Sequence, residues 1–485
     1  MEYETIIGLE VHAQLLTKSK MFCRCSSEYA STPPNTHVCP VCMGMPGVLP
    51  NINRQAVEFT MMTALALNCE VPEFSKFDRK NYPYPDLMKG YQISQFDAPI
   101  GINGWLNVEV DSTTRKLGIT RVHLEEDTAK MMHVNGAAGE SCSLIDINRA
   151  GVPLMEIVGE PDIRSPEEAR QYLINLRTIL QYLGVSTGNM EEGSFRCDAN
   201  ISLRPVNTKE YMPKVEVKNM NSFRAVYRAL EFEIKRQTAL FDQGKLPEQE
   251  TRGWVDAAGK TVSQRSKEYA HDYRYFPEPD LPPLSISRDW VDEVRAKLPE
   301  LSEHRRNRFI SEYGLPLYDA NLLTESRVTA DYYECCVNVD EKGKTRAKAI
   351  SNWILGEYMR LLNAAGSSIG DTKVDPAELC RLIDLVQKGN INGTAAKTVF
   401  EEIFKTGQRA DYIVKKLGLS QITDTSEVED TIVQVIEANP QAVDDYKAGK
   451  TQAVKFLVGQ VMKATRGRVN AAMAQELLIK NLEVK

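Results

Sequence analysis

The chain has 485 residues with 59 basic and 66 acidic side chains, so its formal charge is −7, and 42% of its residues are hydrophobic and 26% charged. These proportions are typical of a globular protein with sizeable cores, and they exclude a disordered, collagen-like or low-complexity chain. They also exclude an integral membrane protein, because no apolar run approaches the roughly 20 residues that span a bilayer.

The first residues begin an alternating pattern and show no signal or transit peptide, so we expect a cytoplasmic protein in which disulfides are rare. The length predicts roughly two to four domains. Residues 1 to about 293 alternate short polar and apolar segments with turn clusters, which favours an antiparallel-rich α+β domain.

Four of the ten cysteines fall within residues 23–42, namely Cys23, Cys25, Cys39 and Cys42. Their spacing can place four thiolates tetrahedrally around Zn²⁺, and the CPVCMG half is typical of a zinc knuckle. The alternative is four reduced thiols without a ligand. We expect a structural zinc site here, with His37 as a substitute ligand only. The other six cysteines are expected to be small core residues: Cys69, Cys142, Cys197, Cys335, Cys336 and Cys380.

Four predicted strands carry polar side chains at alternate positions, while the positions between them are apolar. The polar sets are Glu10, His12 and Gln14; Arg121, His123, Glu125 and Asp127; Arg196, Asp198 and Asn200; and Lys214, Glu216 and Lys218. Glu156 stands alone in an apolar run, where a carboxylate needs a partner. Any single set is best explained as a solvated face, but four sets together weaken that explanation and suit a sheet face that binds Mg²⁺ and a polyphosphate.

Two helices are predicted within this first domain. Ser165 and Pro166 open a capping box, and the apolar residues that follow at helical spacing end at Gly184. A second helix is expected from about Arg224 to Asp242, before Gly244.

After the proline-rich stretch 277–283 the pattern becomes helical. Helices are expected after Asp375, ending at Gly389, and from about Thr394 to Gly407. We therefore predict an all-α domain at about 294–409 and a small all-α tail domain at about 410–485. The tail has six basic residues and no acidic one between Asp445 and Glu476. They are Lys447, Lys450, Lys455, Lys463, Arg466 and Arg468.

Long motifs covering essentially the whole chain make it resemble the B subunits of heterotrimeric glutamyl-tRNA(Gln)/aspartyl-tRNA(Asn) amidotransferases (GatCAB). The matching stretches are IIGLEVHAQL, FDRKNYPYPDLMKGYQISQFD, VHLEEDTAK, INRAGVPLMEIVGEPDIRSPEEA, MEEGSFRCDANISLRP, EVKNMNSFRA, HDYRYFPEPDLPPL and DYKAGKTQAVKFLVGQVMKATRG.

The resemblance implies a cradle-like catalytic domain related in fold to glutamine synthetase, then a helical domain and a tail that contacts tRNA. It implies an ATP-dependent carbon–nitrogen ligase with glutamine as the amido-nitrogen donor. ATP phosphorylates the side-chain carboxylate of Glu-tRNA(Gln) or Asp-tRNA(Asn), and ammonia then displaces phosphate. The ammonia comes from a glutaminase A subunit, and a C subunit stabilises the pair.

The family's motifs carry over residue by residue. They assign Glu10, His12, Glu125 and Glu156 to Mg²⁺ and to catalysis. The binding of nucleotide phosphate or of the reacting carboxylate is assigned to Arg79, Lys80, Arg196, Asp198, Asn200 and Lys218. Tyr82 and Tyr84 suit stacking on adenine, with loop packing as the alternative. The basic residues of the tail suit contacts to the tRNA backbone, with plain solvation as the alternative.

Two other functions compete with this one. A glutamine-synthetase-like ligase for a free amino acid would not need the basic tail. A pure tRNA-binding module would not need the charged faces of four strands. The choice between Glu-tRNA(Gln) and Asp-tRNA(Asn) depends on which synthetases the cell contains.

Overall fold

The structure is a computed structural model that describes residues 2–111, 113–135, 141–208, 210–266, 273–419, 425–447, 450, 452–465, 469 and 471–484. The chain divides into two compact units, Met1–Leu301 and Ser302–Lys485. The first unit combines a large sheet with helices and the second is helical, so the predicted α+β class is confirmed.

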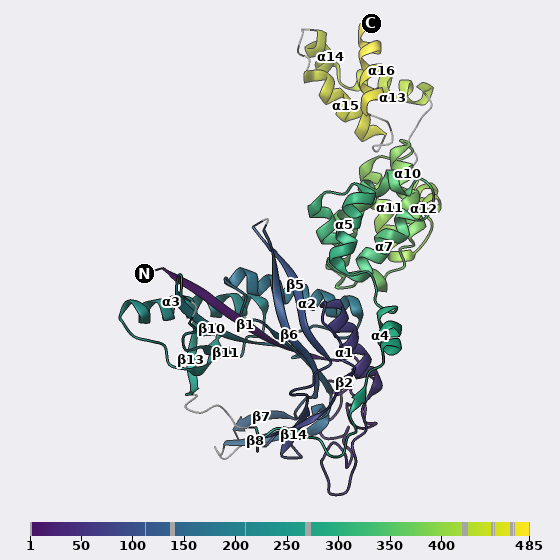
Figure 1. Cartoon of the computed structure of the whole chain (residues 1–485). Coiled ribbons are helices and arrows are strands. Elements are labelled where there is room, and N and C mark those ends of the chain that lie inside the picture. The colour runs from purple at the N-terminus through teal and green to yellow at the C-terminus, as the bar shows by residue number, and fades with distance from the viewer. Residues whose placement is uncertain are drawn as a thin grey trace. The chain divides into compact units, whose positions relative to one another are not determined.

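An eight-stranded sheet forms the centre of the first unit (Figure 1). Its strand order is β13-β12-β11-β10-β1-β9-β6-β5. Strands β11 and β12 pair in parallel, and the other neighbouring strands of this sheet pair antiparallel. The strands are β1 Tyr3–Gln14, β5 Gly101–Val110, β6 Thr113–Glu126, β9 Pro153–Gly159, β10 Phe195–Pro205, β11 Val215–Lys218, β12 Glu250–Val255 and β13 Lys260–Ser266.

Alternation along the central strands separates an apolar face from a polar one. In β1, Ile7, Leu9 and Val11 are at most 1% exposed, whereas Glu10 and His12 at the alternate positions are partly exposed. The apolar side chains join the core with residues of the helices that contact the sheet. Because strand side chains point alternately to opposite faces, the other face is left for polar groups.

The helices of the first unit are α1 Arg54–Ala66, α2 Pro166–Leu183, α3 Phe223–Asp242 and α4 Arg288–Arg295. Helix α2 confirms its predicted limits, because the Ser165 side chain caps its first turn and Gly184 follows with φ +68°. Helix α3 begins one residue earlier than predicted, where the Ser222 side chain accepts a bond from the N–H of Ala225.

Helix α1 was not predicted from the sequence. Asn53 caps it, and eight of its residues are buried. A helix surrounded on most sides by core has no polar face, so its sequence lacks the helical alternation that identified α2 and α3.

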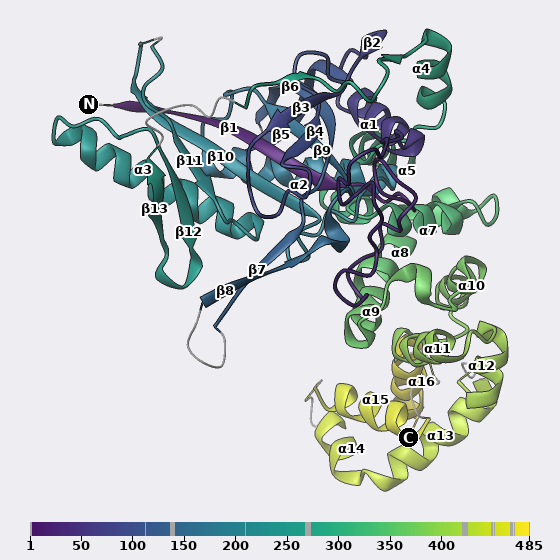
Figure 2. The ribbon, with the colours of Figure 1, turned by 90° about the horizontal axis from the view of Figure 1, so that it is seen from below.

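Shorter strands lie around the main sheet. A three-stranded sheet has the order β14-β3-β4, β15 pairs with β2, and β7 pairs with β8 in a hairpin that projects from the unit in Figure 2. Their limits are β2 Phe74–Ser75, β3 Asp78–Asn81, β4 Tyr91–Ser94, β7 Lys130–Asn135, β8 Ser141–Asp146, β14 Phe276–Pro277 and β15 Leu284–Ser285. Short 3₁₀ turns occur at Ile147–Arg149 and Asp256–Ala258.

The second unit is helical and contains two separate apolar clusters, one between Phe309 and Val414 and one between Val428 and Leu482. Its helices are α5 Ser302–Tyr313, α6 Leu317–Thr324, α7 Arg327–Val337, α8 Gly343–Trp353, α9 Met359–Ala365, α10 Pro376–Gln387, α11 Gly393–Thr406, α12 Ala410–Leu417, α13 Thr425–Ala438, α14 Pro440–Lys447, α15 Gln452–Ala464 and α16 Ala471–Val484. A π-helical turn at Ile354–Tyr358 joins α8 to α9, and a 3₁₀ turn occupies Ile369–Asp371. The predicted helices after Asp375 and near Thr394 are α10 and α11. The division of this unit near residue 410 stays a prediction.

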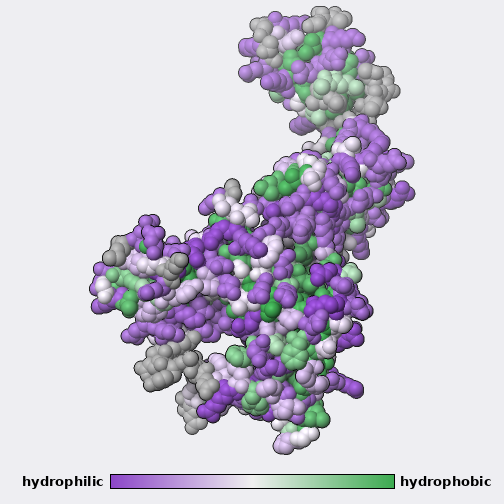
Figure 3. Space-filling model, in the orientation of Figure 1, coloured by the Kyte–Doolittle hydropathy of each residue, from purple (hydrophilic) through white to green (hydrophobic). Residues whose placement is uncertain are grey.

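The surface visible in Figure 3 is mostly hydrophilic, with small hydrophobic patches scattered over it. Among the described helices, none has the length and apolar character needed to cross a membrane.

Candidate active site

The register of three neighbouring strands places three ionisable side chains in one row across the main sheet. His12 of β1 and His123 of β6 are both register partners of Glu156 on β9. The Nε2 atom of His12 lies 3.2 Å from one carboxylate oxygen of Glu156, and that of His123 lies 3.3 Å from the same oxygen. Glu156, which stands alone in an apolar run of sequence, therefore has two histidine partners in the fold.

Two further carboxylates complete the group. Glu125 lies 3.7 Å from His12 and 3.8 Å from His123, and Glu10 lies 3.9 Å from His12. Ligand atoms of Glu10, His12 and Glu156 all lie within 4.8 Å of one another, and so do those of His123, Glu125 and Glu156. We call these five residues the carboxylate–histidine cluster.

Burial and mutual attraction set the protonation of the cluster. Burial alone would lower the pKa of His123, but Glu156 and Glu125 raise it to about 9. Burial would raise the pKa of Glu156, but His123 and His12 bring it well below its usual value. Burial and the charge of Glu156 raise the pKa of Glu10. At neutral pH the His123 imidazole therefore holds a proton, which a divalent cation on the same nitrogen would displace.

The two basic residues predicted on strand β3, Arg79 and Lys80, interact with different acidic residues. Burial would lower the pKa of Lys80, but the nearby charges of Glu125 and Glu156 raise it. Arg79 instead bonds through Nε to Glu278 at 2.7 Å, a side chain with 0% exposure, and lies 3.3 Å from an Asp280 oxygen. Lys80 is therefore near enough to the cluster to interact with the charges of Glu125 and Glu156, whereas Arg79 is paired with Glu278.

Strands β10 and β11 extend the polar face away from the cluster. The predicted residues on them all lie on this face: Arg196, Asp198, Asn200 and Lys218. Arg196 and Asp198 are register partners of His12 and Glu10. The Nζ atom of Lys218 lies 2.6 Å from Asp198 and 3.3 Å from Glu216. The cluster thus continues into a charged strip of mixed sign.

The predicted tyrosines differ in their surroundings. The hydroxyl of Tyr82 donates to Gln92 at 3.4 Å, and the Lys80 ammonium lies 5.8 Å from its ring centre. Tyr84 is 55% exposed. Stacking of either ring on adenine stays a prediction.

His123 was not selected from the sequence as a site residue. It lies two positions before Glu125 on the polar face of β6, so the alternation that identified Glu125 applies equally to it. What the sequence could not reveal is its register with Glu156, which decides that it joins the cluster.

The model of the GatB/GatE catalytic domain matches residues 5–292, and that of the GatB domain matches residues 331–482. The chain belongs to the GatB/GatE family. Similar relatives are each named as the B subunit of an aspartyl/glutamyl-tRNA(Asn/Gln) amidotransferase. The protein from Dehalococcoides mccartyi is 59% identical over 491 residues, which cover 99% of each chain. That from Thermomicrobium roseum is 55% identical over 483 residues, covering 100% of this chain and 99% of the relative. That from Carboxydothermus hydrogenoformans is 54% identical over 477 residues, covering 98% of each.

Within the part that matches the GatB/GatE catalytic domain, the four predicted cysteines also come together. One sulfur from each lies within 4.8 Å of the others, in the group Cys23, Cys25, Cys39 and Cys42. The Cys42 sulfur accepts a hydrogen bond from the backbone N–H of Cys39 at 3.1 Å. Its neighbour Cys23 lowers the pKa of Cys42 to about 5, while burial raises that of Cys25 to about 11. Without a cation the four thiols cannot all ionise, whereas a bound dication would deprotonate them together.

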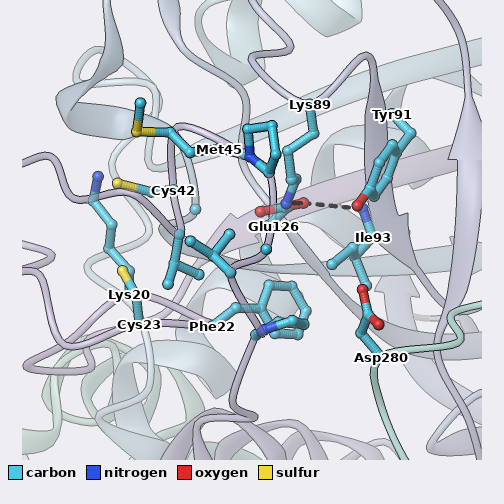
Figure 4. A pocket seen from close by; sticks show the side chains of 17 residues that line it. Lys20, Phe22, Cys23, Cys42, Met45, Lys89, Tyr91, Ile93, Glu126 and Asp280 are labelled. Carbon is cyan, nitrogen blue, oxygen red and sulfur yellow. Dashed lines mark hydrogen bonds and ion pairs between the residues drawn. The ribbon is translucent and has the colours of Figure 1, made fainter.

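A cavity of about 210 Å³ lies beside this cysteine group (Figure 4). Cys23, Cys42 and the 1% exposed Lys20 line it, together with the ion pair between Lys89 and Glu126. Lys20 donates from Nζ to the backbone carbonyl of residue 37 at 2.8 Å and adds a positive charge near Cys42. Lys20 also donates to the backbone carbonyl of Ile147 at 3.4 Å, so a buried cation joins the cysteine segment to a distant part of the first unit.

The prediction that the other cysteines are core residues is wrong for two of them. Cys142 and Cys335 are exposed. Cys142 lies on the two-stranded β7–β8 hairpin. Cys335 and the buried Cys336 are neighbours on helix α7, where consecutive side chains point in different directions around the helix. The remaining four are buried: Cys69, Cys197, Cys336 and Cys380.

The tail of this family member presents several of its predicted lysines to solvent. On α15, Val454, Leu457 and Val461 are buried, whereas Lys455 and Lys463 are exposed. Lys447 at the end of α14 is also exposed, and Lys450 pairs with Asp445 at 2.8 Å. Arg466 and Arg468 lie outside the described residues.

Proposed function

We propose that this chain is the B subunit of a tRNA-dependent amidotransferase and that the carboxylate–histidine cluster is its catalytic centre. The observation that carries the proposal is the meeting of three carboxylates and two imidazoles on one sheet face, flanked by Lys80, Arg196 and Lys218. The names of relatives that match nearly the whole chain support the same function.

The proposed reaction converts the side-chain carboxylate of Glu-tRNA(Gln) or Asp-tRNA(Asn) into an amide in two steps. A carboxylate oxygen attacks the γ-phosphorus of ATP, and the bond to the β–γ bridging oxygen breaks, so ADP leaves with the electron pair. Ammonia then attacks the acyl carbon and loses a proton. The bond from that carbon to the phosphorylated oxygen breaks, and inorganic phosphate leaves.

The side chains of the polar face would mainly position the reactants and stabilise charge, which is what phosphoryl transfer requires. Nucleotide phosphates or the reacting carboxylate are assigned to Lys80, Arg196, Asp198, Asn200 and Lys218. For Arg79 we propose a structural role instead, because its guanidinium is bonded to the buried Glu278.

A divalent cation fits the cluster. Glu10, His12, Glu125 and Glu156 would hold it, and His123 offers a further nitrogen at the same place. Closely spaced carboxylate oxygens suit Mg²⁺, and the imidazoles make the site suitable for Mn²⁺ as well. When bound, the cation would neutralise phosphate charge during transfer.

For the cysteine group we propose a structural zinc site. Four sulfurs within 4.8 Å of one another, and a backbone N–H directed at Cys42, are typical of a closed tetrathiolate site.

The finer architecture is part of the proposal. It comprises a glutamine-synthetase-like cradle at residues 1–293, a helical domain at 294–409 and a tRNA-binding tail at 410–485. The exposed lysines of α14 and α15 support the role of the tail. An A subunit would supply ammonia from glutamine, and a C subunit would stabilise the pair. The cytoplasmic location stays a prediction.

The proposal is tested by an amide-formation assay with Glu-tRNA(Gln), ATP and either glutamine or ammonia, with and without the A subunit. We expect ammonia to support product formation in the absence of the A subunit, and glutamine to require that subunit. Equal ATP turnover with free glutamate and with Glu-tRNA(Gln) would instead indicate a ligase for free amino acids. Binding of tRNA without ATP turnover under any condition would indicate a binding module.

A further inference from the structure

Asp127 is a buried carboxylate beside the polar face that belongs to neither group of cluster ligands. It follows β6 directly, and its side chain is only 2% exposed. Its two oxygens have separate partners. One accepts a bond from the N–H of Thr128 at 2.9 Å and lies 3.8 Å from Arg149. The other accepts a bond from Gln14 at 2.7 Å and lies 3.0 Å from Arg196.

A buried charge needs such partners, because an ionised carboxylate out of water is costly unless it is paired and hydrogen-bonded. Both oxygens of Asp127 have such partners, so the carboxylate is paired and hydrogen-bonded from several directions. A side chain held in this way determines where the guanidinium it binds can lie.

The guanidinium of Arg196 has N–H donors beyond the one that Asp127 binds. It is the register partner of His12, and its side chain is 37% exposed. Its Nη2 atom is bonded to Asp127, whereas its buried Nε atom has no hydrogen-bond partner among the described residues. A guanidinium offers five N–H donors in a fixed plane, so a partner on one edge leaves the rest available for an anion.

The same carboxylate is connected to the cysteine segment. Gln14 lies on β1, two residues after His12, and its amide oxygen accepts a bond from the hydroxyl of Tyr29 at 3.0 Å. Because Asp127 can only accept, the Gln14 amide must direct its NH₂ to Asp127 and its oxygen to Tyr29. Tyr29 lies between Cys25 and Cys39 in the sequence, so these bonds join the segment that carries the cysteines to Arg196.

We propose that Asp127, Gln14 and Tyr29 form a clamp that positions Arg196 to bind an anionic group of the substrate. The anion is either the γ-phosphate of ATP or the side-chain carboxylate of the aminoacyl-tRNA. This inference rests on the proposed function. Asp127 is in this view a positioning residue that acts through Arg196, and the cysteine segment is a support for the active face.

The test uses the full-length chain assembled with its A and C subunits. Two constants are measured: the Kd for ATP by titration calorimetry, and the KM for Glu-tRNA(Gln) in amide formation. The variants are Arg196→Lys, Asp127→Asn, Tyr29→Phe, and the last two each combined with Arg196→Lys. The control is Glu168→Gln, which removes the 2.6 Å ion pair with Arg115 near the start of α2.

We expect Arg196→Lys and Asp127→Asn each to raise one of the two constants by about 10- to 100-fold, the range for losing a hydrogen bond to a charged group. Tyr29→Phe should raise the same constant by about two- to fivefold. The constant that moves identifies the anion as phosphate or carboxylate. In the Arg196→Lys background, the second substitution should add less than about twofold, because coupled residues are not additive.

A full effect of Asp127→Asn in the Arg196→Lys background would overturn the clamp, since a merely structural residue loses as much in either background. An unchanged pair of constants in Arg196→Lys would overturn it as well. If Asp127→Asn does not fold, Tyr29→Phe gives the same comparison, because it removes only a hydroxyl. The ATP titration does not depend on amide formation, so the clamp and the proposed function can fail separately.

Discussion

Glu156→Gln is the substitution that should affect the proposed metal site most. Glu156 is the residue shared by both groups of cluster ligands, whereas Glu10 and Glu125 each belong to one. It also bonds both imidazoles, at 3.2 and 3.3 Å. Glutamine has nearly the same shape, so the change removes a charge and a ligand oxygen without leaving a cavity.

The expected magnitude follows from this shared position. Loss of a residue that only orients a metal ligand typically costs about 10- to 100-fold in metal affinity. A direct ligand common to both groups should cost at least about 100-fold, and Glu10→Gln or Glu125→Gln should cost less. Binding of Mn²⁺ measured by electron paramagnetic resonance, and tRNA-dependent release of ADP, should fall together.

The matched control is Glu126→Gln. Glu126 is also buried, but it pairs with Lys89 and accepts a bond from the N–H of Ile93 at 3.0 Å, away from the cluster. It should lower the unfolding temperature and leave Mn²⁺ affinity nearly unchanged. If Glu156→Gln kept Mn²⁺ affinity within about threefold of wild type, the cluster would not be a metal site.

Three further predictions concern pH, zinc and tRNA. In metal-free protein, burial would lower the pKa of His123, but the neighbouring carboxylates raise it to about 9. The stability it contributes should therefore be full below the unfolded pKa of about 6.5 and be lost as the pH rises through 9, so calorimetry should show wild type and His123→Gln converging above that pH. Addition of Mn²⁺ at pH 7.5 should release protons, so the measured heat of Mn²⁺ binding should vary with the ionisation enthalpy of the buffer. The same heat of binding in buffers of different ionisation enthalpy would contradict this. Cys42→Ser should abolish zinc content and lower the unfolding midpoint by about 5 °C or more, whereas Cys142→Ser at an exposed site should change neither. Zinc-free wild type with an unchanged midpoint would refute the assignment. The tail variant replaces three exposed lysines by alanine: Lys447, Lys455 and Lys463. It should reduce the slope of log affinity for tRNA against log salt by about 0.7–0.9 for each phosphate that is no longer neutralised, while Lys405→Ala on α11 should leave the slope unchanged. An unaltered slope in the tail variant would exclude phosphate binding by these lysines.

Local signals in the sequence were sufficient for some elements. Ser165 and Pro166 act on the first turn of α2, and Gly184 acts on its last turn. The limits of this helix could therefore be predicted without knowing the rest of the fold. Alternation likewise assigned Glu10 and His12 to one face of β1, because the strand period is a property of the backbone itself.

Contacts between distant segments could not be predicted in this way. The partners of Glu156 depend on the registers of β9 with β1 and β6, which result from packing of the whole sheet. For the same reason the sequence did not separate Lys80 from Arg79, whose partner Glu278 lies about 200 residues further along the chain. The bond between Asp127 and Arg196 is similarly non-local.

The central claim is that ATP activates the side-chain carboxylate of an aminoacyl-tRNA by phosphorylation on this face. The most direct measurement uses Glu-tRNA(Gln) labelled with ¹⁸O in the side-chain carboxylate, together with ATP, ammonia and the assembled complex. If the carboxylate oxygen attacks phosphorus, the inorganic phosphate released with the amide must carry one ¹⁸O atom. Amide formation with ATP cleavage but unlabelled phosphate would contradict the account.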